Sequence, residues 1–399
     1  MNRKLTQKGL RRPHPQGPRP LADAVLQLIW EERRMSRADI ARLADLSRST
    51  VSEIVNEILR TGLITEVGEG PSRGGRRPIL LEFRDDACVI LGVEMGASHV
   101  EVVATDLRGN PLRSAAEEHP VRDDPAGTRE LIGRLCEACL ENSERPLVGI
   151  GVGVPCPVDR DNSGRLSDVV LPAWEGRLGL EGLAESYGVP LLIDNDANLG
   201  ALAELWWGVG QGIDDMVYIK VATGIGSGHV VGGEIYRGST GFAGEIGHIA
   251  IDPRGKKCVC GLNGCLVTLV GGHALAGRAE ELATQYPDSP LAKGGNSIRE
   301  IEDAALAGDP LALQVAREAA ANLGTAIASL LNVLNPSMVV LGGDLARLGD
   351  LLLEPLRETV GRRTLVSSLQ AAQIRTSGFD SQSVAIGGAT LALKSALQD

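Results

Sequence analysis

The sequence contains no run of about eighteen consecutive apolar residues, the length a transmembrane helix requires, so we expect no membrane span. The first twenty residues, MNRKLTQKGLRRPHPQGPRP, are basic and proline-rich and lack the apolar stretch of a secretory signal peptide. Cysteine is scarce: there are seven in 399 residues, an odd number, with three clustered and the others in apolar surroundings. That usage is typical of the reducing cytoplasm. We therefore expect a cytoplasmic protein with no membrane partner.

Basic residues are unevenly distributed along the chain. Residues 1–84 carry 16 Lys and Arg against 10 Asp and Glu, a net charge of +6, whereas the remainder carries 24 against 41, a net charge of −17. Because nucleic acid attracts a basic surface and repels an acidic one, the first 84 residues are the expected contact with a polyanion. A segment that only aids solubility would give the same split. Residues 1–20 are too polar to fold by themselves and are predicted to form a disordered basic tail.

Residues 21–84 show the pattern of a winged helix-turn-helix domain with three helices. The apolar stripe that predicts the first helix is Leu21, Val25, Leu28 and Ile29. Ser36 is the expected N-cap of the second helix, and Ser47 is the expected N-cap of the third, which Gly62 ends. The buried face expected for the second helix is Ile40, Leu43 and Ala44. The buried face expected for the third is Val51, Ile54, Val55, Ile58 and Leu59.

The outward face of the third helix is short and polar, as a helix that enters a major groove must be. The residues of this helix expected to contact DNA are Arg48, Ser49, Thr50, Ser52, Glu53 and Asn56. A strand, a glycine-rich loop and a second strand follow, which predicts a wing. Arg73, Arg76 and Arg77 at its tip suit the negative potential of a minor groove. A solvated hairpin on a protein-docking module is the alternative, but the charge split favours DNA.

From residue 85 onward, strand-like and helical segments alternate, which predicts an α/β body built around sheets. Strands followed by glycine turns recur in both halves, in GVEMG, KVATGIGSG and VVLGG. This recurrence predicts two similar lobes around a cleft. The glycines would let backbone N–H groups approach an anion, although a tight strand turn needs glycine in any case.

Three clustered cysteines and one histidine form a candidate metal site. The four residues are His248, Cys258, Cys260 and Cys265. One imidazole and three thiolates suit tetrahedral Zn²⁺, and four protein ligands leave no position for water, so the expected zinc is structural. Cysteines packed as small hydrophobic residues would be unusual in a stretch as polar as RGKKCVCGLNGC. Cys136 and Cys139 lie in a helical pattern without a second ligand pair, and we expect them to be packing residues.

Six segments, in order and spacing, resemble the ROK family of sugar kinases and sugar-responsive repressors. They are GVEMGASH, VPCPVD, IDNDANLGALAE, ATGIGSGHVVGGEIYRGSTGFAGEIGHI, CVCGLNGC and VVLGGD. The resemblance begins near residue 87 and runs to the end, and the preceding winged helix ending in GRRP is similar to the repressor branch. It implies an actin-like, ribonuclease H-like body of sugar-kinase type. Its first lobe would span residues 85–204, completed by the C-terminal helix, and its second lobe, with the zinc loop, residues 205–399.

The resemblance also implies a sugar site beside the zinc. Its residues would be Asn195, Asp196, Glu245 and His248, of which His248 would serve both sugar and metal. Asp196 matches the catalytic base of the family, whereas Asp194 and Asn198 are expected to be turn and helix-cap residues. Family kinases use a further carboxylate where this chain has Val267. An unpaired hydroxyl there would cost about 1 to 3 kcal/mol, so the ligand lacks that hydroxyl, bears an apolar group there or binds weakly.

The phosphate-binding turn departs from the family pattern. Family kinases carry an Asp-x-Gly-Gly-Thr-Lys-like turn, whereas this chain has EMGASH, with Glu94, Ala97 and His99 at the altered positions. A misplacement of about 1 Å can lower a rate about a hundredfold, and three changes share this loop. We therefore expect the kinase reaction to be lost or feeble, with no ATP or Mg²⁺ as cofactor. Asp196 would be kept as an acceptor for a ligand hydroxyl.

Taken together, these patterns predict a sugar-responsive transcriptional regulator of the repressor type with structural Zn²⁺. Its partners would be operator DNA, a sugar or sugar-like effector, and a second copy of the chain in a homodimer or a dimer of dimers. One alternative is an ATP-dependent sugar kinase with an attached DNA-binding domain. Another is a DNA-bound scaffold that responds to no ligand.

Overall fold

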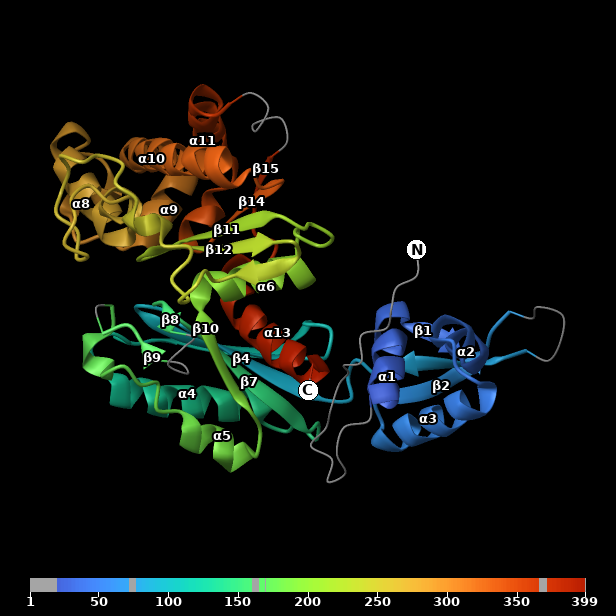
Figure 1. The fold of residues 1–399 in the computed structure, drawn as a ribbon. Helices are drawn as coiled ribbons and strands as arrows, with labels where there is room; N and C mark the ends of the chain where they lie inside the picture. The colour runs from blue at the N-terminus through green and yellow to red at the C-terminus, as the bar shows by residue number, and fades with distance from the viewer. Residues whose placement is uncertain (1–19, 72–76, 160–164, 169, 366–371, 399) are drawn as a thin grey trace.

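The computed structural model describes residues 20–71, 77–159, 165–168, 170–365 and 372–398. A small N-terminal domain lies beside a larger body of two lobes (Figure 1). Within the described ranges, no helix is both long and apolar enough to cross a membrane. All but the last residue of the expected basic tail, and the expected wing residues Arg73 and Arg76, lie outside those ranges.

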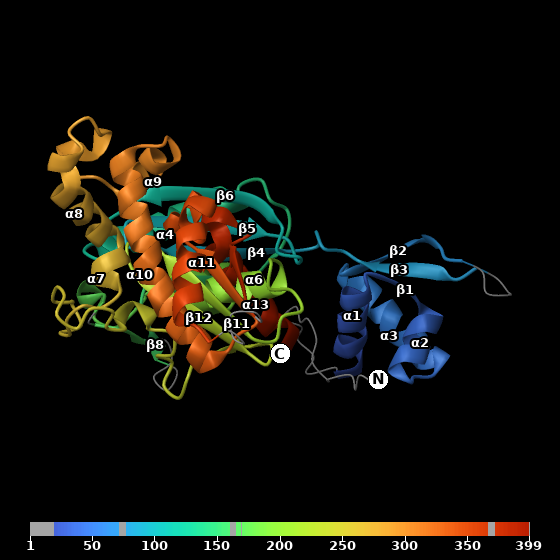
Figure 2. The same cartoon turned by 90° about the horizontal axis from the view of Figure 1, so that it is seen from above.

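The N-terminal domain consists of three helices and a three-stranded sheet of order β1-β3-β2. Its elements are α1 (Pro20–Glu32), β1 (Arg34–Ser36), α2 (Arg37–Ala44), α3 (Arg48–Thr61), β2 (Ile64–Glu69) and β3 (Ile79–Phe83). The antiparallel strands β2 and β3 extend away from the body (Figure 2). The three predicted helices and the two strands of the predicted wing are confirmed, and β1 is an additional strand.

The helix caps of this domain form as predicted. Ser36 Oγ accepts a hydrogen bond from the backbone N–H of Asp39 at 3.2 Å, and the Asp39 carboxylate accepts one from the backbone N–H of Ser36 at 3.3 Å. Ser47 Oγ accepts from the backbone N–H of Thr50 at 3.1 Å. Gly62 ends α3 with a left-handed φ of 75°, a conformation that glycine adopts without strain. These local bonds set the limits of both helices of the motif.

Two residues of the predicted buried faces are exposed instead. Leu43 of α2 is 52% exposed and Leu21 of α1 is 50% exposed. The second helix is short and enters the core through Ile40, so its last turn lies outside that core. Leu21 lies in the first turn of α1, before the helix residues that form the core, which begin at Val25. Periodicity identifies the face of a helix but not how far along it the neighbouring elements reach.

The two lobes are built on five-stranded mixed sheets of the same topology. The order is β10-β7-β4-β5-β6 in lobe 1 and β13-β12-β11-β14-β15 in lobe 2. In each lobe the first three strands form an antiparallel meander, and two later strands add in parallel beside the first. The strands of lobe 1 are β4 (Val89–Met95), β5 (His99–Thr105), β6 (Pro111–Glu118), β7 (Leu147–Val154) and β10 (Leu191–Asn195). Those of lobe 2 are β11 (Met216–Val221), β12 (Ile225–Val231), β13 (Glu234–Tyr236), β14 (Met338–Gly342) and β15 (Gln373–Thr376).

Further helices cover the outer faces of the two sheets. On lobe 1 they are α4 (Pro125–Leu140) and α5 (Glu181–Tyr187), with a small hairpin of β8 (Val158–Asp159) and β9 (Arg165–Leu166). On lobe 2 they are α7 (Val267–Val270), α8 (Gly272–Leu282), α9 (Ile298–Leu306), α10 (Pro310–Leu334) and α11 (Asp350–Arg363). Cys136 and Cys139 are buried between α4 and the sheet of lobe 1. Burial raises the pKa of Cys136 to about 12, so this thiol stays protonated, in agreement with a packing role.

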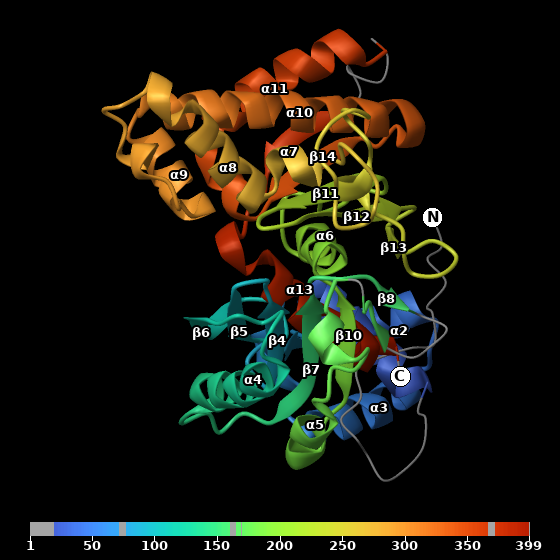
Figure 3. The same cartoon turned by 90° about the vertical axis from the view of Figure 1, so that its left-hand side faces the viewer.

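Two helices lie between the sheets, α6 (Asp196–Trp206) and α13 (Ser383–Gln398) (Figure 3). Helix α13 packs on β4 and β7 of lobe 1, α6 packs on β11 and β12 of lobe 2, and the two helices pack on each other. Glycine allows the close approach of α13, because a Cβ on Gly92 would lie 1.7 Å from the carbonyl oxygen of Ala385. Helix α6 therefore contacts both lobes, although most of it falls within the residue range expected for the first.

Candidate functional site

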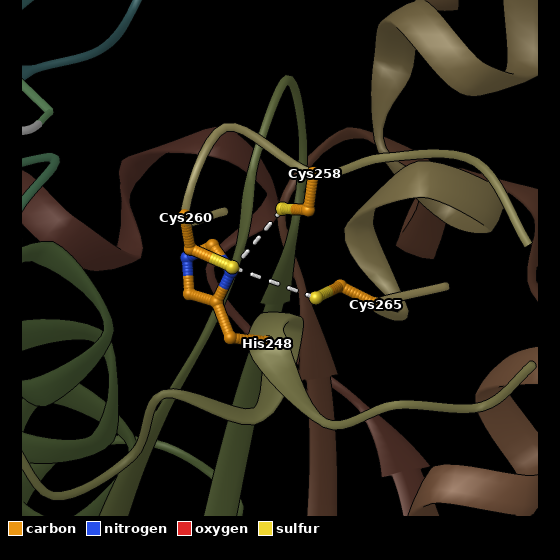
Figure 4. A group of neighbouring side chains, drawn as sticks. All are labelled: His248, Cys258, Cys260 and Cys265. Carbon is orange, nitrogen blue, oxygen red and sulfur yellow. Dashed lines mark hydrogen bonds between the residues drawn. The ribbon is translucent and has the colours of Figure 1, made fainter. Parts of the chain in front are cut away.

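The predicted metal ligands converge in space (Figure 4). The ligand atoms of His248, Cys258, Cys260 and Cys265 all lie within 4.8 Å of one another. Cys258 Sγ is 3.5 Å from His248 Nδ1, and Cys260 Sγ is 3.7 Å from Cys265 Sγ. Tetrahedral zinc with bonds of about 2.3 Å to sulfur and about 2.0 Å to nitrogen separates its ligands by about 3.6 to 3.8 Å. The donor set and its spacing therefore fit Zn²⁺, which would be held entirely by protein ligands.

The backbone of the cysteine loop fixes the positions of the thiols. The backbone N–H of Cys258 donates to the carbonyl oxygen of Leu262 at 2.7 Å, which closes a tight turn around Cys260. Gly264 has a φ of 65°, and a Cβ there would lie 1.5 Å from the carbonyl oxygen of Asp252. Only glycine fits this position, next to the third cysteine.

His248 faces the metal site on one side and Glu245 on the other. Its Nδ1 points toward Cys258, while its Nε2 is 3.9 Å from Glu245 Oε2. Burial lowers the pKa of His248, which favours the neutral imidazole that a metal ligand must be. A metal bound at Nδ1 would fix the orientation of the His248 ring. It would thereby also fix the position of Nε2, the ring nitrogen that faces Glu245.

Asn195 caps helix α6 at the junction of the lobes. Its Oδ1 accepts from the backbone N–H groups of Ala197 and Asn198 at 3.0 and 3.3 Å, and its Nδ2 donates to the carbonyl oxygen of Cys156 at 3.2 Å. Asp194 and Asn198 were expected to be turn and helix-cap residues, but their side chains do not cap α6. Asn198 Nδ2 donates to Asp194 Oδ1 at 3.0 Å, and the same oxygen accepts from the backbone N–H of Asn195 at 2.8 Å. The second N–H of the Asn195 amide makes no hydrogen bond to a residue in the described ranges.

Asp196, the first residue of α6, lies beside the other predicted ligand-binding residues. Burial raises the pKa of Glu245, and the charge of Asp196 raises it further, so the two carboxyl groups are close enough to interact. Asn195 precedes Asp196 directly, and His248 contacts Glu245. The structure thus brings all four predicted sugar-site residues together where the lobes meet.

The predicted recognition helix presents its polar face to solvent. Arg48, Ser49, Glu53 and Asn56 are exposed, and Thr50 and Ser52 are half-buried. An open hollow of about 400 Å³ lies between this helix, the start of α2 and the wing. It is lined by Ser36, Arg37, Ala38, Arg48, Ser52, Arg77, Pro78 and Ile79. Three arginines therefore surround one concave surface. Arg37, which the sequence analysis did not single out, also donates to Asn56 Oδ1 at 3.3 Å.

Comparison with known proteins agrees with this arrangement. The ROK family profile matches residues 90–395, and a winged helix-turn-helix DNA-binding profile matches residues 24–65. The chain belongs to the ROK family. It is 30% identical over 370 residues to the xylose repressor of Caldicellulosiruptor bescii, an alignment that covers 91% of this chain and 92% of that protein. The predicted fold class, a winged helix followed by a two-lobed sugar-kinase-like body, is thereby confirmed.

Two solved structures resemble the chain closely. A ROK family transcriptional regulator described as a homolog of the Escherichia coli MLC protein has a TM-score of 0.77 and 27% identity, covering 94% of this chain and 95% of that one. The ROK family glucokinase of Streptomyces griseus, solved with glucose and AMPPNP, has a TM-score of 0.70 and 27% identity. The match covers 77% of this chain and 99% of the glucokinase, so the glucokinase aligns along nearly its whole length and the winged helix is additional.

The first glycine turn of the ROK body is covered by a histidine. Gly96 lies between β4 and β5, and a Cβ there would be 2.4 Å from the ring of His99. The imidazole occupies the space directly above the turn, and Glu94, at the end of β4, is buried beneath it. Two of the three residues that differ from the family pattern, Glu94 and His99, therefore lie next to each other, whereas Ala97 is exposed.

Val267 begins helix α7 and packs, partly buried, against the core of lobe 2. It follows Cys265, the last of the predicted metal ligands, by two residues, so the cysteine loop determines its position. The valine side chain offers no hydrogen bond, so Val267 does not supply the hydroxyl partner that the family resemblance implies at this position.

Lys220 is a site residue that the sequence analysis missed. It lies on β11, is 8% exposed, and its Nζ contacts Glu94 Oε1 at 2.5 Å and Asp196 Oδ2 at 2.9 Å. The signal was present in MVYIKV, where a lysine interrupts an otherwise apolar strand. A charged residue in a buried strand requires a partner, but the sequence alone does not identify which one.

Three tryptophans join the winged helix to the ROK body. The ring centroid of Trp30, near the end of α1, lies 6.1 Å from that of Trp206 and 6.2 Å from that of Trp207. Trp206 is the last residue of α6, and Trp207 follows it. The guanidinium carbon of Arg108 lies over the Trp30 ring, 4.3 Å from its centroid. The indole N–H of Trp30 donates to the carbonyl oxygen of Leu107 at 3.3 Å. The hydrophobic core of the winged helix is continuous with the end of α13. The two domains therefore share a packed interface rather than a flexible linker.

Proposed function

We propose that this chain is a sugar-responsive transcriptional repressor that binds operator DNA as a homodimer through its winged helices. The charge split, the arginine-lined hollow and the similarity to a xylose repressor support DNA binding. The cluster of Asn195, Asp196, Glu245 and His248 supports recognition of a polyhydroxylated ligand, because carboxylates and amides pair with hydroxyl groups. A DNA target makes the cytoplasm the working compartment.

Helix α6 is the observation that carries this proposal. It begins at Asp196, beside the predicted sugar site, and ends at Trp206, which packs on Trp30 of the winged helix. Eleven residues of α-helix span about 16 Å and move as one element. A ligand that changes the position of the α6 N-terminus would therefore change the packing at the tryptophans. In a homodimer that shift would alter how the two winged helices match two half-sites.

The effector we propose to test first is xylose, because the similar Caldicellulosiruptor protein is named a xylose repressor. Val267 removes one hydroxyl partner, so a sugar with fewer hydroxyl groups suits the site better than a hexose. Zn²⁺ at the Cys₃His site would hold the cysteine loop and His248 in place beside the ligand.

To test the proposal, operator sequences would be selected in vitro from random DNA with the zinc-loaded protein, and affinity then measured with and without each sugar. We expect a sugar that binds the protein to change operator affinity about 5- to 150-fold, the usual range of coupling between sites. Equal affinity with and without every sugar that binds would remove the proposal, since a ligand shifts only an equilibrium whose states it distinguishes.

A sugar kinase with an attached DNA-binding domain is the second candidate. The complete match to the Streptomyces griseus glucokinase and the retained glycine turn at residues 223–226 favour it. Against it, His99 covers the first glycine turn and Glu94 is tied to Lys220. We infer that phosphoryl transfer is lost. ADP release on mixing with MgATP and any monosaccharide, abolished by Asp196→Asn, would establish the kinase instead.

We expect Asp196→Asn to weaken sugar binding by about 10- to 100-fold. The amide replaces a charged acceptor, and a hydrogen bond to a charged group contributes about 1.5 to 3 kcal/mol. Isothermal titration calorimetry with the sugar identified above measures the effect. The matched control is Asp214→Asn, which makes the same change at an exposed position and should leave affinity unchanged. Equal affinity of the Asp196 variant and the parent protein would exclude Asp196 from the sugar site.

We expect Arg48→Ala combined with Arg77→Ala to weaken binding to any duplex and to flatten its salt dependence. Each phosphate contact contributes about 0.9 to the slope of log affinity against log salt, so losing two should reduce the slope by about 1.8. Fluorescence anisotropy across a salt series measures this. Arg177→Ala, at an exposed position on the ROK body, serves as the control. An unchanged slope in the double variant would contradict the role of the hollow.

A further inference from the structure

Glu94 and Lys220 occupy equivalent positions in the two lobes. Glu94 is the next-to-last residue of β4, the first strand of lobe 1, and Lys220 is the next-to-last residue of β11, the first strand of lobe 2. Each pairs with a glycine on the neighbouring parallel strand, Glu94 with Gly153 and Lys220 with Gly342. The repeated architecture therefore brings an acid and a base together from the ends of the two central strands.

The ammonium group of Lys220 lies between two carboxylates, at 2.5 Å from Glu94 and 2.9 Å from Asp196. Lys220 is 8% exposed and Glu94 is 2% exposed, so water screens little of their attraction. Burial by itself would lower the pKa of Lys220, but the carboxylates of Asp196 and Glu94 raise it overall, and the lysine is charged. It is a counter-ion fixed to the protein.

One oxygen of this cluster has no partner. Glu94 Oε2 is buried and makes no hydrogen bond to any described residue. Two further titratable side chains face Glu94: His99, whose Nε2 is 3.9 Å from Glu94 Oε1, and Glu101, which lies opposite Glu94 on β5. Mg²⁺ and Mn²⁺ prefer oxygen ligands such as carboxylates. Glu94 and Asp196 supply two carboxylates, and Glu94 Oε2 has no hydrogen-bond partner among the described residues. Without the ammonium group, the pair would form a divalent-cation site.

We propose that Lys220 is a built-in cation that takes the place of a divalent metal ion between Glu94 and Asp196 and excludes such an ion. A divalent ion at these oxygens would be in direct contact with the ammonium, where repulsion in a buried site is strong. Lys220 thereby holds the Asp196 carboxylate in place through their 2.9 Å contact, so that Asp196 accepts a ligand hydroxyl group without a metal–nucleotide complex. The proposal goes beyond the function above, because it concerns ion occupancy and holds whether or not the chain regulates transcription.

The experiment titrates Mn²⁺ into the full-length, zinc-loaded protein and follows free Mn²⁺ by electron paramagnetic resonance. The parent protein should take up no Mn²⁺ at this site. Lys220→Ser removes the ammonium, leaves room for an ion with its water ligands, and should bind a single Mn²⁺ under conditions in which the parent binds none. Adding Glu94→Gln to that variant should abolish the uptake, which assigns it to this carboxylate pair. Lys220→Arg keeps the charge and should exclude Mn²⁺ like the parent.

Two results would overturn the proposal: equal Mn²⁺ affinity of the parent and Lys220→Ser, or no uptake by a folded Lys220→Ser variant. If the serine variant unfolds, Lys220→Met leaves a smaller cavity, and Mn²⁺ should raise its melting temperature but not that of the parent. An unchanged melting temperature of Lys220→Met in the presence of Mn²⁺ would also overturn the proposal. Sugar-dependent operator binding of the parent protein is measured separately, so a failure of the repressor function and a failure of this assignment are distinguishable.

Discussion

Cys260→Ser is expected to abolish zinc binding and, with it, most of the response to sugar. Cys260 is the exposed ligand of the predicted set, so its replacement leaves no new cavity in the core. A serine hydroxyl is a poor zinc ligand, and three remaining ligands would not hold the cysteine loop against His248. Because His248 faces Glu245, we expect the affinity for sugar to fall by about 10- to 100-fold. Zinc content by mass spectrometry and calorimetry with the sugar measure the two effects.

The control for this prediction is Lys257→Ala, which changes an exposed side chain next to Cys258 and removes no ligand. It should keep its zinc and its sugar affinity. Operator binding without sugar should survive in Cys260→Ser, because the winged helix packs on the ends of α6 and α13, away from the zinc loop. Full sugar affinity in a zinc-free protein would show that the metal does not organise the site.

Trp30→Ala is expected to separate sugar binding from operator binding. Trp30 is the residue of α1 that contacts both tryptophans at the end of α6. Its loss removes the packed connection along which a shift of α6 would reach the winged helix. Sugar should bind with unchanged affinity, whereas its effect on operator affinity should fall from about 5- to 150-fold to near unity. Paired calorimetry and anisotropy titrations on the same protein give both numbers.

Trp30→Phe keeps part of the ring packing and should retain part of the coupling. Leu21→Ala changes a half-exposed residue of the same helix and should leave the coupling between sugar and operator binding unchanged. A Trp30→Ala protein that binds sugar and still responds fully would mean that the signal takes another route, such as α13. Melting curves of each variant exclude partial unfolding as the cause of a lost response.

The features that could be predicted from sequence are those encoded by neighbouring residues. Ser36, Ser47 and Gly62 limit their helices through bonds to residues at most three positions away, and these caps were predicted correctly. The convergence of His248, Cys258, Cys260 and Cys265 was predicted because three cysteines within eight residues can reach one point whatever surrounds them. The similar lobes were predicted because a strand followed by a glycine turn is repeated in the sequence.

Contacts between distant segments could not be predicted in this way. Lys220 was recognisable only as a charge inside an apolar strand, and its partners, Glu94 and Asp196, lie 126 and 24 positions away. The Trp30 contact with Trp206 spans the boundary between domains. Leu43 was assigned to the core by its helical spacing and proved exposed, because the extent of the neighbouring elements decides burial at a helix end.

The sequence by itself determined that this chain has a basic winged helix, a two-lobed ROK body and a Cys₃His cluster able to hold a metal ion, since each of these depends on local pattern, composition or short spacing. Only the tertiary structure decided that α6 links the predicted sugar site to the winged helix, and that a lysine lies between the two carboxylates of that site. Both arrangements depend on how two sheets and two crossing helices pack, and that geometry brings together side chains whose separation in the chain gives no sign of their contact.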